Sequence, residues 1–120
     1  MTEEKDIVWM SALELASAIK RGRLSPVEVL EIFLKRIKAL NPKINAFVTL
    51  TEESARTEAK ECEKAVKVRK KLGPLHGIPV AIKDNIPVKG VRTTWGSKLF
   101  ENYIPNEDMI LVDRLRRAGA

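Results

Sequence analysis

The sequence has only one cysteine, Cys62, and only one histidine, His76, among its 120 residues. A single cysteine excludes a disulfide within the chain, and these two residues supply too few soft ligands for an ordinary structural zinc site. They also exclude a Cys–His or Ser–His pair built on any histidine other than His76. Any further base in this chain must therefore be a carboxylate or a lysine.

Aromatic residues are scarce, at 5%, and long apolar runs are absent. No run approaches the ~20 apolar residues that a helix needs to cross a bilayer. The start, MTEEKDIVWM, is acidic and mixed, whereas a secretory signal has a basic region before an apolar one. We therefore expect a cytoplasmic protein, with a globular composition and enough residues for one modest core.

The net charge of +6 raises the question of nucleic-acid binding. The basic residues are spread over separate clusters, most of them near the expected C-terminal ends of helices, where cations favour the helix dipole. Aromatic residues do not alternate with them, as they do on surfaces that stack bases. We expect no direct nucleic-acid binding, and a small basic module that docks an acidic partner is the alternative from another functional class.

Two helix signals open the chain. Ser11 and Glu14 have the spacing of a capping box, and apolar residues at helical spacing follow until Gly22. Ser25-Pro26 repeats the signal, with proline at the first helical position, and apolar residues continue at helical spacing. Asn41-Pro42 is expected to end this second helix, because the residue before a proline is disfavoured in helical geometry.

The rest of the chain alternates between expected extended and helical segments. Residues 44–50, INAFVTL, predict a short extended segment, and residues 52–71 predict a long helix. Cys62 lies on the apolar face of that helix and is interpreted as a buried small hydrophobe. Residues 106–108 are expected to cap a last helix, which Gly119 ends.

The segment GIPVAIKDN, residues 77–85, has the apolar alternation of a β-strand. Residues 86–105 follow with scattered turn signals and no clear helix, and a connection of this length in a compact domain is usually functional. Helices first, then strand, connection and helix, predict an α/β fold: a helical layer followed by the first strands and helix of a mixed sheet covered by helices. Because these are the first parts of a βαβ unit, we expect the chain to be the front of a longer protein.

Lys83 ends the expected strand. In water a lysine has a pKa of about 10.4 and cannot accept a proton at neutral pH. Loss of water around the amine lowers that pKa, so a lysine at the end of an interior strand could serve as a general base. The alternative is a surface lysine that extends into solvent and pairs with Asp84.

Residues 73–120 closely resemble the amidase signature family. Residues 77–85 resemble the strand that carries the catalytic lysine of that family, and TTWGSK, residues 93–98, resembles the loop that follows it. Residues 11–48 are similar to its N-terminal helical layer. The resemblance implies that residues 1–120 are the N-terminal part of an amidase domain with an incomplete amidase-signature fold. Residues 1–72 would be the mainly helical layer, and 73–120 the catalytic-lysine strand, the loop and the following helix.

The resemblance also implies a reaction, the cleavage of a carboxamide through a Ser–cis-Ser–Lys triad. A neutral lysine accepts a proton relayed through a bridging serine, while a second serine attacks the carboxamide carbon and an amine leaves. Lys83 matches the triad lysine. Both triad serines are expected beyond residue 120, so the 120-residue piece alone is expected to be inactive. The resemblance implies no cofactor and no metal.

Three neighbours of Lys83 are not assigned to this chemistry. Ser97 matches a position that is not a nucleophile in the family, and His76 is interpreted as a turn residue. Asp84 is expected to organise the strand end through hydrogen bonds to the backbone. The resemblance leaves open a stand-alone amidase or the A subunit of a glutamine-dependent aminoacyl-tRNA amidotransferase, which would need other subunits. Trp95 makes the loop more similar to the stand-alone amidases.

Overall fold

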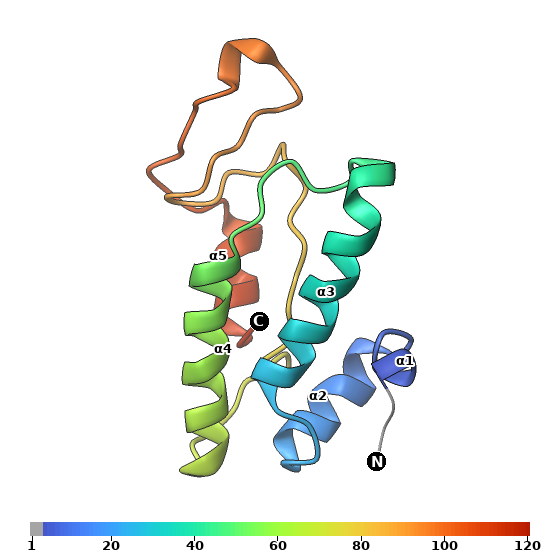
Figure 1. Cartoon of the computed structure of the whole chain (residues 1–120). Coiled ribbons are helices and arrows are strands. Elements are labelled where there is room, and N and C mark those ends of the chain that lie inside the picture. The colour runs from blue at the N-terminus through green and yellow to red at the C-terminus, as the bar shows by residue number, and fades with distance from the viewer. Residues whose placement is uncertain (1–3) are drawn as a thin grey trace.

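The computed structural model describes residues 4–120, in which all the regular elements are helical (Figure 1). In Figure 1 the two longest helices, α3 and α4, stand side by side, α1 and α2 lie below α3, and the loop of residues 86–108 projects at the top. This part of the chain measures 46 × 32 × 21 Å. The elements are α1 Glu4–Ile7, α2 Ala12–Lys20, α3 Pro26–Ile44, α4 Glu52–Lys67, the 3-10 turn η1 Lys98–Phe100, and α5 Ile110–Arg117.

The predicted strand at residues 77–85 forms no β-ladder within residues 4–120, so the mixed sheet is not observed there. Figure 1 shows this segment as a single extended trace that runs up between α3 and the α4–α5 side. The apolar alternation is only partly used, because Ile78 is buried while Val80 is exposed. A strand is completed by main-chain hydrogen bonds to a partner, and no segment of the described chain supplies one.

Capping was predicted correctly at the start of α2. Ser11 Oγ accepts the backbone N–H of Glu14 at 3.2 Å, and Glu14 Oε2 accepts the N–H of Ser11 at 2.7 Å. The hydrogen bonds from Ser11 lower the pKa of Glu14. This reciprocal arrangement satisfies two of the donors that a helix leaves unpaired at its first turn.

The predicted end of α3 at Asn41-Pro42 was wrong by one helical turn. The helix includes Pro42 and ends at Ile44, and its C-cap Asn45 has a left-handed φ of 50° and donates its N–H to the C=O of Asn41 at 2.7 Å. The Asn41 side chain binds both the N–H and the C=O of Phe47, at 2.8 and 3.1 Å. Because these contacts direct the chain out of the helix after residue 45, a proline in the last turn removes one donor without ending the helix.

Two further boundaries differ from the prediction. The fourth helix ends at Lys67 rather than at 71, and Arg69 follows with a left-handed φ of 52°. No side chain of residues 106–108 caps α5, whose N-cap is Met109. Asp108 instead accepts the backbone N–H of Lys89 at 2.7 Å and pairs with Arg116 at 3.0 Å. It therefore joins the loop to α5.

The core lies where α1, α2 and the start of α3 meet the extended segment. Gly77 stands against this core, since a methyl group there would lie 2.9 Å from Pro26 Cγ and 3.4 Å from Ile19 Cγ2, and its φ is +76°. The helices thus fix the beginning of the segment that leads to Lys83. The buried residues of the core are Ile7, Leu15, Ala16, Ile19, Leu24, Val29 and Ile78.

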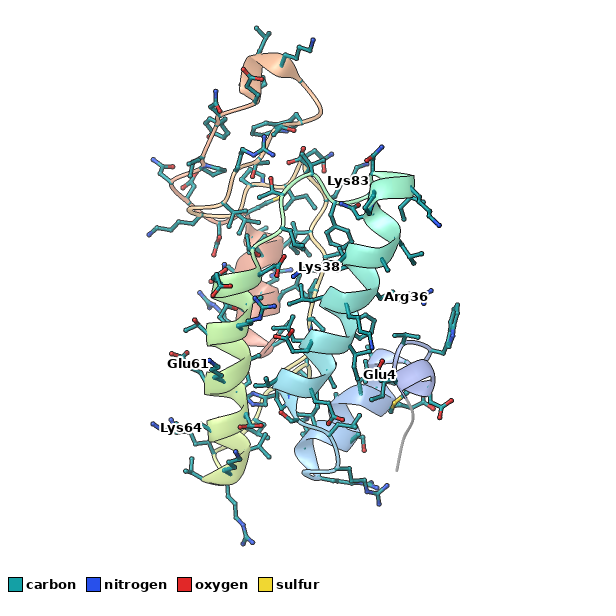
Figure 2. All side chains as sticks on the ribbon, in the orientation of Figure 1. Glu4, Arg36, Lys38, Glu61, Lys64 and Lys83 are labelled. Atoms are coloured by element: carbon teal, nitrogen blue, oxygen red, sulfur yellow. The ribbon has the colours of Figure 1, made fainter. Side chains whose placement is uncertain are left out.

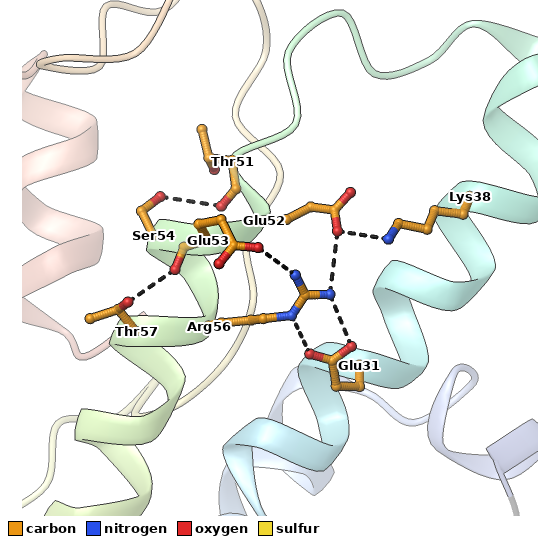
Figure 3. A network of polar contacts seen from close by, with 8 residues as sticks. All are labelled: Glu31, Lys38, Thr51, Glu52, Glu53, Ser54, Arg56 and Thr57. Carbon is orange, nitrogen blue, oxygen red and sulfur yellow. Dashed lines mark hydrogen bonds and ion pairs between the residues drawn. The ribbon is translucent and has the colours of Figure 1, made fainter.

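Charged side chains join α3 to α4, while others on α4, such as Glu61 and Lys64, point away from α3 (Figure 2). Figure 3 shows Arg56 of α4 bound to Glu31 of α3 through two hydrogen bonds of 2.6 and 3.2 Å, and to Glu52 at 3.3 Å. The hydrogen bond from Arg56 holds the pKa of Glu31 below its usual value. In a connected network one fixed side chain serves several bonds, so less side-chain entropy is lost for each bond than in isolated surface pairs. The network therefore holds the two helices together better than single pairs would.

Ser25 links the start of α3 to α4, and its removal is expected to be costly. Its Oγ accepts the N–H of Val27 at 3.0 Å and donates to Glu63 Oε1 at 2.6 Å. We expect Ser25→Ala to lower the free energy of unfolding by about 0.5–2 kcal/mol in urea denaturation. Ser11→Ala is the matched control, because that cap is exposed and touches no second helix. A larger loss for Ser11→Ala than for Ser25→Ala would contradict this prediction.

Within residues 4–120, no helix has both the length and the apolar character needed to cross a bilayer.

Candidate functional site

Lys83 lies where the extended segment ends and the loop begins (Figure 2). The N–H of Ile86 donates to the C=O of Lys83 at 2.9 Å, so the chain turns immediately after the lysine. The Lys83 side chain is exposed, and its ammonium forms no ion pair with a carboxylate of the described residues. The removal of water that the sequence predicts for this amine is therefore not provided by residues 4–120.

Asp84 ties this turn to the middle of the loop. Its Oδ1 accepts the backbone N–H of Thr94 at 2.8 Å, and its Oδ2 accepts the Thr94 hydroxyl. Its backbone C=O accepts the N–H of Trp95 at 2.9 Å. Asp84 thus organises the end of the segment through hydrogen bonds, as expected, and it does not pair with Lys83.

The environment of Asp84 favours its charged form. Burial raises the pKa of the carboxyl. Hydrogen bonds from the Thr94 hydroxyl and from the N–H groups of Thr94 and Gly96, together with the charge of Arg92, lower the pKa by more than burial raises it. The net pKa lies below the usual value for an aspartate. Asp84 is therefore a fixed acceptor rather than a group that exchanges protons near neutral pH.

Two arms of the loop are held together by backbone hydrogen bonds. Gly90 N–H donates to Pro105 C=O at 2.9 Å, and the N–H of the buried Thr93 donates to Tyr103 C=O at 3.0 Å. Arg92 donates to the C=O of Glu101 at 3.0 Å and to that of Val48 at 3.1 Å, which connects the loop to the chain before α4. The loop is therefore fixed on both sides of residues 93–97.

The tip of the loop carries three aromatic side chains and the short turn η1. The ring centroid of Trp95 lies 5.2 Å from that of Phe100 and 5.3 Å from that of Tyr103. Ser97 Oγ accepts the N–H of Leu99 at 3.3 Å and so caps η1. This turn was not predicted, since no apolar period marks three residues. Ser97 is a cap in this structure, and its lack of a nucleophilic role stays a prediction.

His76 lies in the turn before Gly77, as predicted, and it is buried. One of its ring nitrogens, Nε2, is 2.9 Å from the backbone oxygen of Cys62. The Cys62 side chain is half-buried, and burial raises the pKa of its thiol, so it behaves as a small hydrophobe. The bond between them supports the turn, and neither residue takes part in the hydrogen bonds between Asp84 and Thr94.

The turn at residues 73–77 rests on the end of α5. Leu75 N–H donates to Ala118 C=O at 2.9 Å, and Gly77 N–H donates to Gly119 C=O at 2.9 Å. A methyl group at Gly73 would lie 2.2 Å from the Ala118 oxygen, so only glycine permits this approach. Helix α5 therefore supports the beginning of the segment whose other end carries Lys83.

Sequence reasoning missed Thr94, the partner of Asp84. The available signal was an aspartate at the end of an apolar segment, because such a carboxylate needs hydrogen-bond donors. Two threonines, which can supply them, follow among turn residues nine and ten positions later. No group of three or more histidine, cysteine or carboxylate side chains gathers into a possible metal site among residues 4–120.

Comparison with known proteins gives matches along most of the chain. A family model described as Amidase matches residues 28–120. The A subunit of the Glutamyl-tRNA(Gln) amidotransferase of Carboxydothermus hydrogenoformans is 44% identical over 115 residues, which are 96% of this chain and 24% of that protein. An Acylamidase of Rhodococcus erythropolis is 40% identical over 116 residues, 97% of this chain and 24% of that protein. The chain thus spans 24% of the length of these two relatives.

Solved structures match the fold as well. Fatty acid amide hydrolase superposes with a TM-score of 0.91 at 33% identity, over 100% of this chain and 21% of its own. The native peptide amidase from Stenotrophomonas maltophilia superposes with a TM-score of 0.85 at 33% identity, over 92% of this chain and 23% of its own. The arrangement of helices, extended segment and loop is therefore one that amidases share.

Proposed function

Because the chain belongs to the amidase signature family, we propose that it is part of an enzyme that hydrolyses a carboxamide with Lys83 as catalytic base. The observation that carries this proposal is the position of Lys83. It lies at a turn fixed by hydrogen bonds, within the part that the family model matches, and no carboxylate of residues 4–120 neutralises its amine. A base needs such a fixed position to take a proton from a donor at hydrogen-bond distance.

In this proposal the uncharged Lys83 amine accepts a proton that a bridging serine relays from a second serine. That second serine attacks the carbonyl carbon of the amide, the C–N bond breaks, and the amine leaves with the relayed proton. Water then cleaves the acyl-enzyme. Three serines of the chain cap helix starts, and the other two lie within helices, so both reacting serines are proposed to lie in other segments of a longer protein. The caps are Ser11, Ser25 and Ser97, and the serines within α2 and α4 are Ser17 and Ser54.

The same longer protein would supply what residues 4–120 do not. We propose that further segments pair with residues 77–85 in a mixed sheet, and that they cover Lys83. Loss of water disfavours the charged form of a lysine amine, so such a cover would make Lys83 a competent base. Residues 1–72 would then be a supporting layer, and residues 73–120 would deliver the lysine and its loop.

An assay of simple carboxamides tests the proposal. A longer protein that contains this chain is expected to release ammonia or an amine, while the 120-residue chain alone is expected to show no turnover above buffer. The comparison requires both proteins at equal concentration, with product measured directly. Turnover by the 120-residue chain alone would refute the triad, because one base without its serines cannot form the acyl-enzyme.

A second candidate is the A subunit of an aminoacyl-tRNA amidotransferase, which the 44% identity to such a subunit favours. The 40% identity to an acylamidase and the Trp95 variant of the loop favour a stand-alone amidase. The protein partners of the longer protein distinguish these two candidate functions. Co-purification with a tRNA-binding subunit, together with activity on glutamine, would select the transferase.

The basic binding module gains no support from the family match. Several of its cations are already paired with carboxylates on the same surface, such as Lys35 with Glu4 at 2.8 Å and Lys67 with Glu63 at 2.7 Å. A cytoplasmic location stays an expectation from the sequence.

A further inference from the structure

We propose that Thr94 is a positioning residue that keeps the Asp84 carboxylate away from the Lys83 amine. The inference rests on the proposed function, in which that amine must be uncharged. The two residues are consecutive in the sequence and stand at one turn, so an Asp84 carboxylate that is not bound elsewhere could turn toward the ammonium. An opposite charge within about 4–6 Å would hold the lysine in its protonated form and prevent it from accepting a proton.

Both oxygens of Asp84 are bound by Thr94 instead. Oδ1 accepts the Thr94 N–H at 2.8 Å, and Oδ2 accepts the Thr94 hydroxyl. The Thr94 oxygen in turn accepts the N–H of Gly96 at 3.2 Å, while its one hydrogen is donated to Asp84. One threonine thereby uses its backbone and its side chain to hold one carboxylate in one orientation.

Burial makes this arrangement stable. Thr94 is 5% exposed, and the Asp84 side chain is half-buried against it. Hydrogen bonds to an ionised acceptor are stronger than neutral ones, and limited access to water strengthens them further. Releasing the carboxylate toward Lys83 would leave a buried hydroxyl without its acceptor.

The other charged groups leave this assignment unchanged. Arg92 is the charged side chain that acts on the Asp84 carboxyl. Its guanidinium donates to the backbone oxygens of Glu101 and Val48 rather than to Asp84. Lys83 has no ion pair with any charged side chain of residues 4–120. Thr94 is therefore the residue that binds both oxygens of the carboxylate and leaves neither free toward the amine.

The test is the pH dependence of kcat/KM of the whole enzyme, whose acid limb reports the pKa of its essential base. Thr94→Val keeps the side-chain shape and removes the hydroxyl. It frees one Asp84 oxygen to pair with Lys83, which favours the charged form of the amine and is expected to move the acid limb about one unit to higher pH. At a pH on that limb, kcat/KM is expected to fall about tenfold.

Three further variants make the test specific. Thr94→Ser retains a hydroxyl and is expected to keep the acid limb where it is in the unmodified enzyme. The double variant Thr94→Val with Asp84→Asn has no carboxylate to release, so its limb is expected to return. Thr93→Val is the matched control, because Thr93 is also buried but its hydroxyl donates to the Val91 C=O at 3.1 Å. It loosens the loop without freeing a charge, and its limb is expected to stay.

Each result decides the inference. An unmoved limb in Thr94→Val, or an equal movement in Thr93→Val, overturns it. If Thr94→Val does not fold, Asp84→Asn alone decides. Neutralising a well-bound carboxylate is expected to move the limb by less than about half a unit, whereas a larger fall shows that the carboxylate already acts on Lys83 and overturns the inference. Activity retained in Lys83→Ala would instead refute the proposed function.

Discussion

Replacing Lys83 with alanine is expected to lower the kcat of the whole enzyme on a simple carboxamide by about 10²- to 10⁴-fold, the usual contribution of a positioned general base. KM should change little, because the lysine acts on a proton and not on substrate binding. Lys83→Arg is expected to be equally inactive, since a guanidinium keeps its charge at any pH the enzyme survives. Measurement of kcat and KM for these variants shows whether residue 83 must accept a proton or need only carry a positive charge.

Lys89→Ala is the matched control for this prediction. Lys89 lies six residues further along the same loop, its side chain is exposed, and only its backbone N–H is bound, by Asp108 at 2.7 Å. Its activity is expected to stay within about twofold of the unmodified enzyme. Activity retained in Lys83→Arg would mean that a positive charge is what the reaction needs, and the proposed role of Lys83 would be wrong.

Ile19→Ala is expected to lower the free energy of unfolding by about 2–5 kcal/mol, the range for removing a buried aliphatic side chain. Ile19 is 0% exposed in the core, and its side chain faces Gly77 at the start of the Lys83 segment. The lost methyl groups leave a cavity between α2 and that segment, which rigid neighbours can fill only in part. Urea denaturation with a shared m-value measures the change.

Leu13→Ala, on the same helix, separates burial from helix propensity. Leu13 is 79% exposed, so its truncation is expected to change the free energy of unfolding by less than about 0.5 kcal/mol. Both variants place alanine in α2, and the intrinsic helical preference therefore changes in the same direction. If the two variants cost the same, the core would not lie where the structure places it.

The helices were predictable because their signals are local. The capping box at Ser11 and the cap at Ser25 each involve residues two or three positions apart, and both are present in the structure. The end of α3 depends on a contact between Asn41 and the backbone of Phe47, beyond the turn, which no helical rule includes. The strand failed for a related reason, since its identity depends on a partner that residues 4–120 do not contain.

The candidate site divides in the same way. The position of Lys83 came from the resemblance of its flanking residues, and the structure places it at the junction of segment and loop. The hydrogen bonds between Asp84 and Thr94 join residues ten positions apart in an irregular segment. Such a segment has no repeating apolar pattern from which the contact could be predicted. The role of Asp84 as a hydrogen-bond acceptor could be expected from the sequence, whereas its partner Thr94 could be identified only in the folded structure.

The contact between residues 73–77 and the end of α5 imposes an order on assembly during translation. The N–H groups of Leu75 and Gly77 find their acceptors only at Ala118 and Gly119, which a ribosome makes much later. Until those carbonyls have left the exit tunnel, the turn beneath Lys83 has nothing to rest on, and its apolar neighbours stay accessible to chaperones. The nascent helical layer can form earlier from its own local signals, whereas the segment that carries Lys83 gains its support only after residues 118 and 119 have been made.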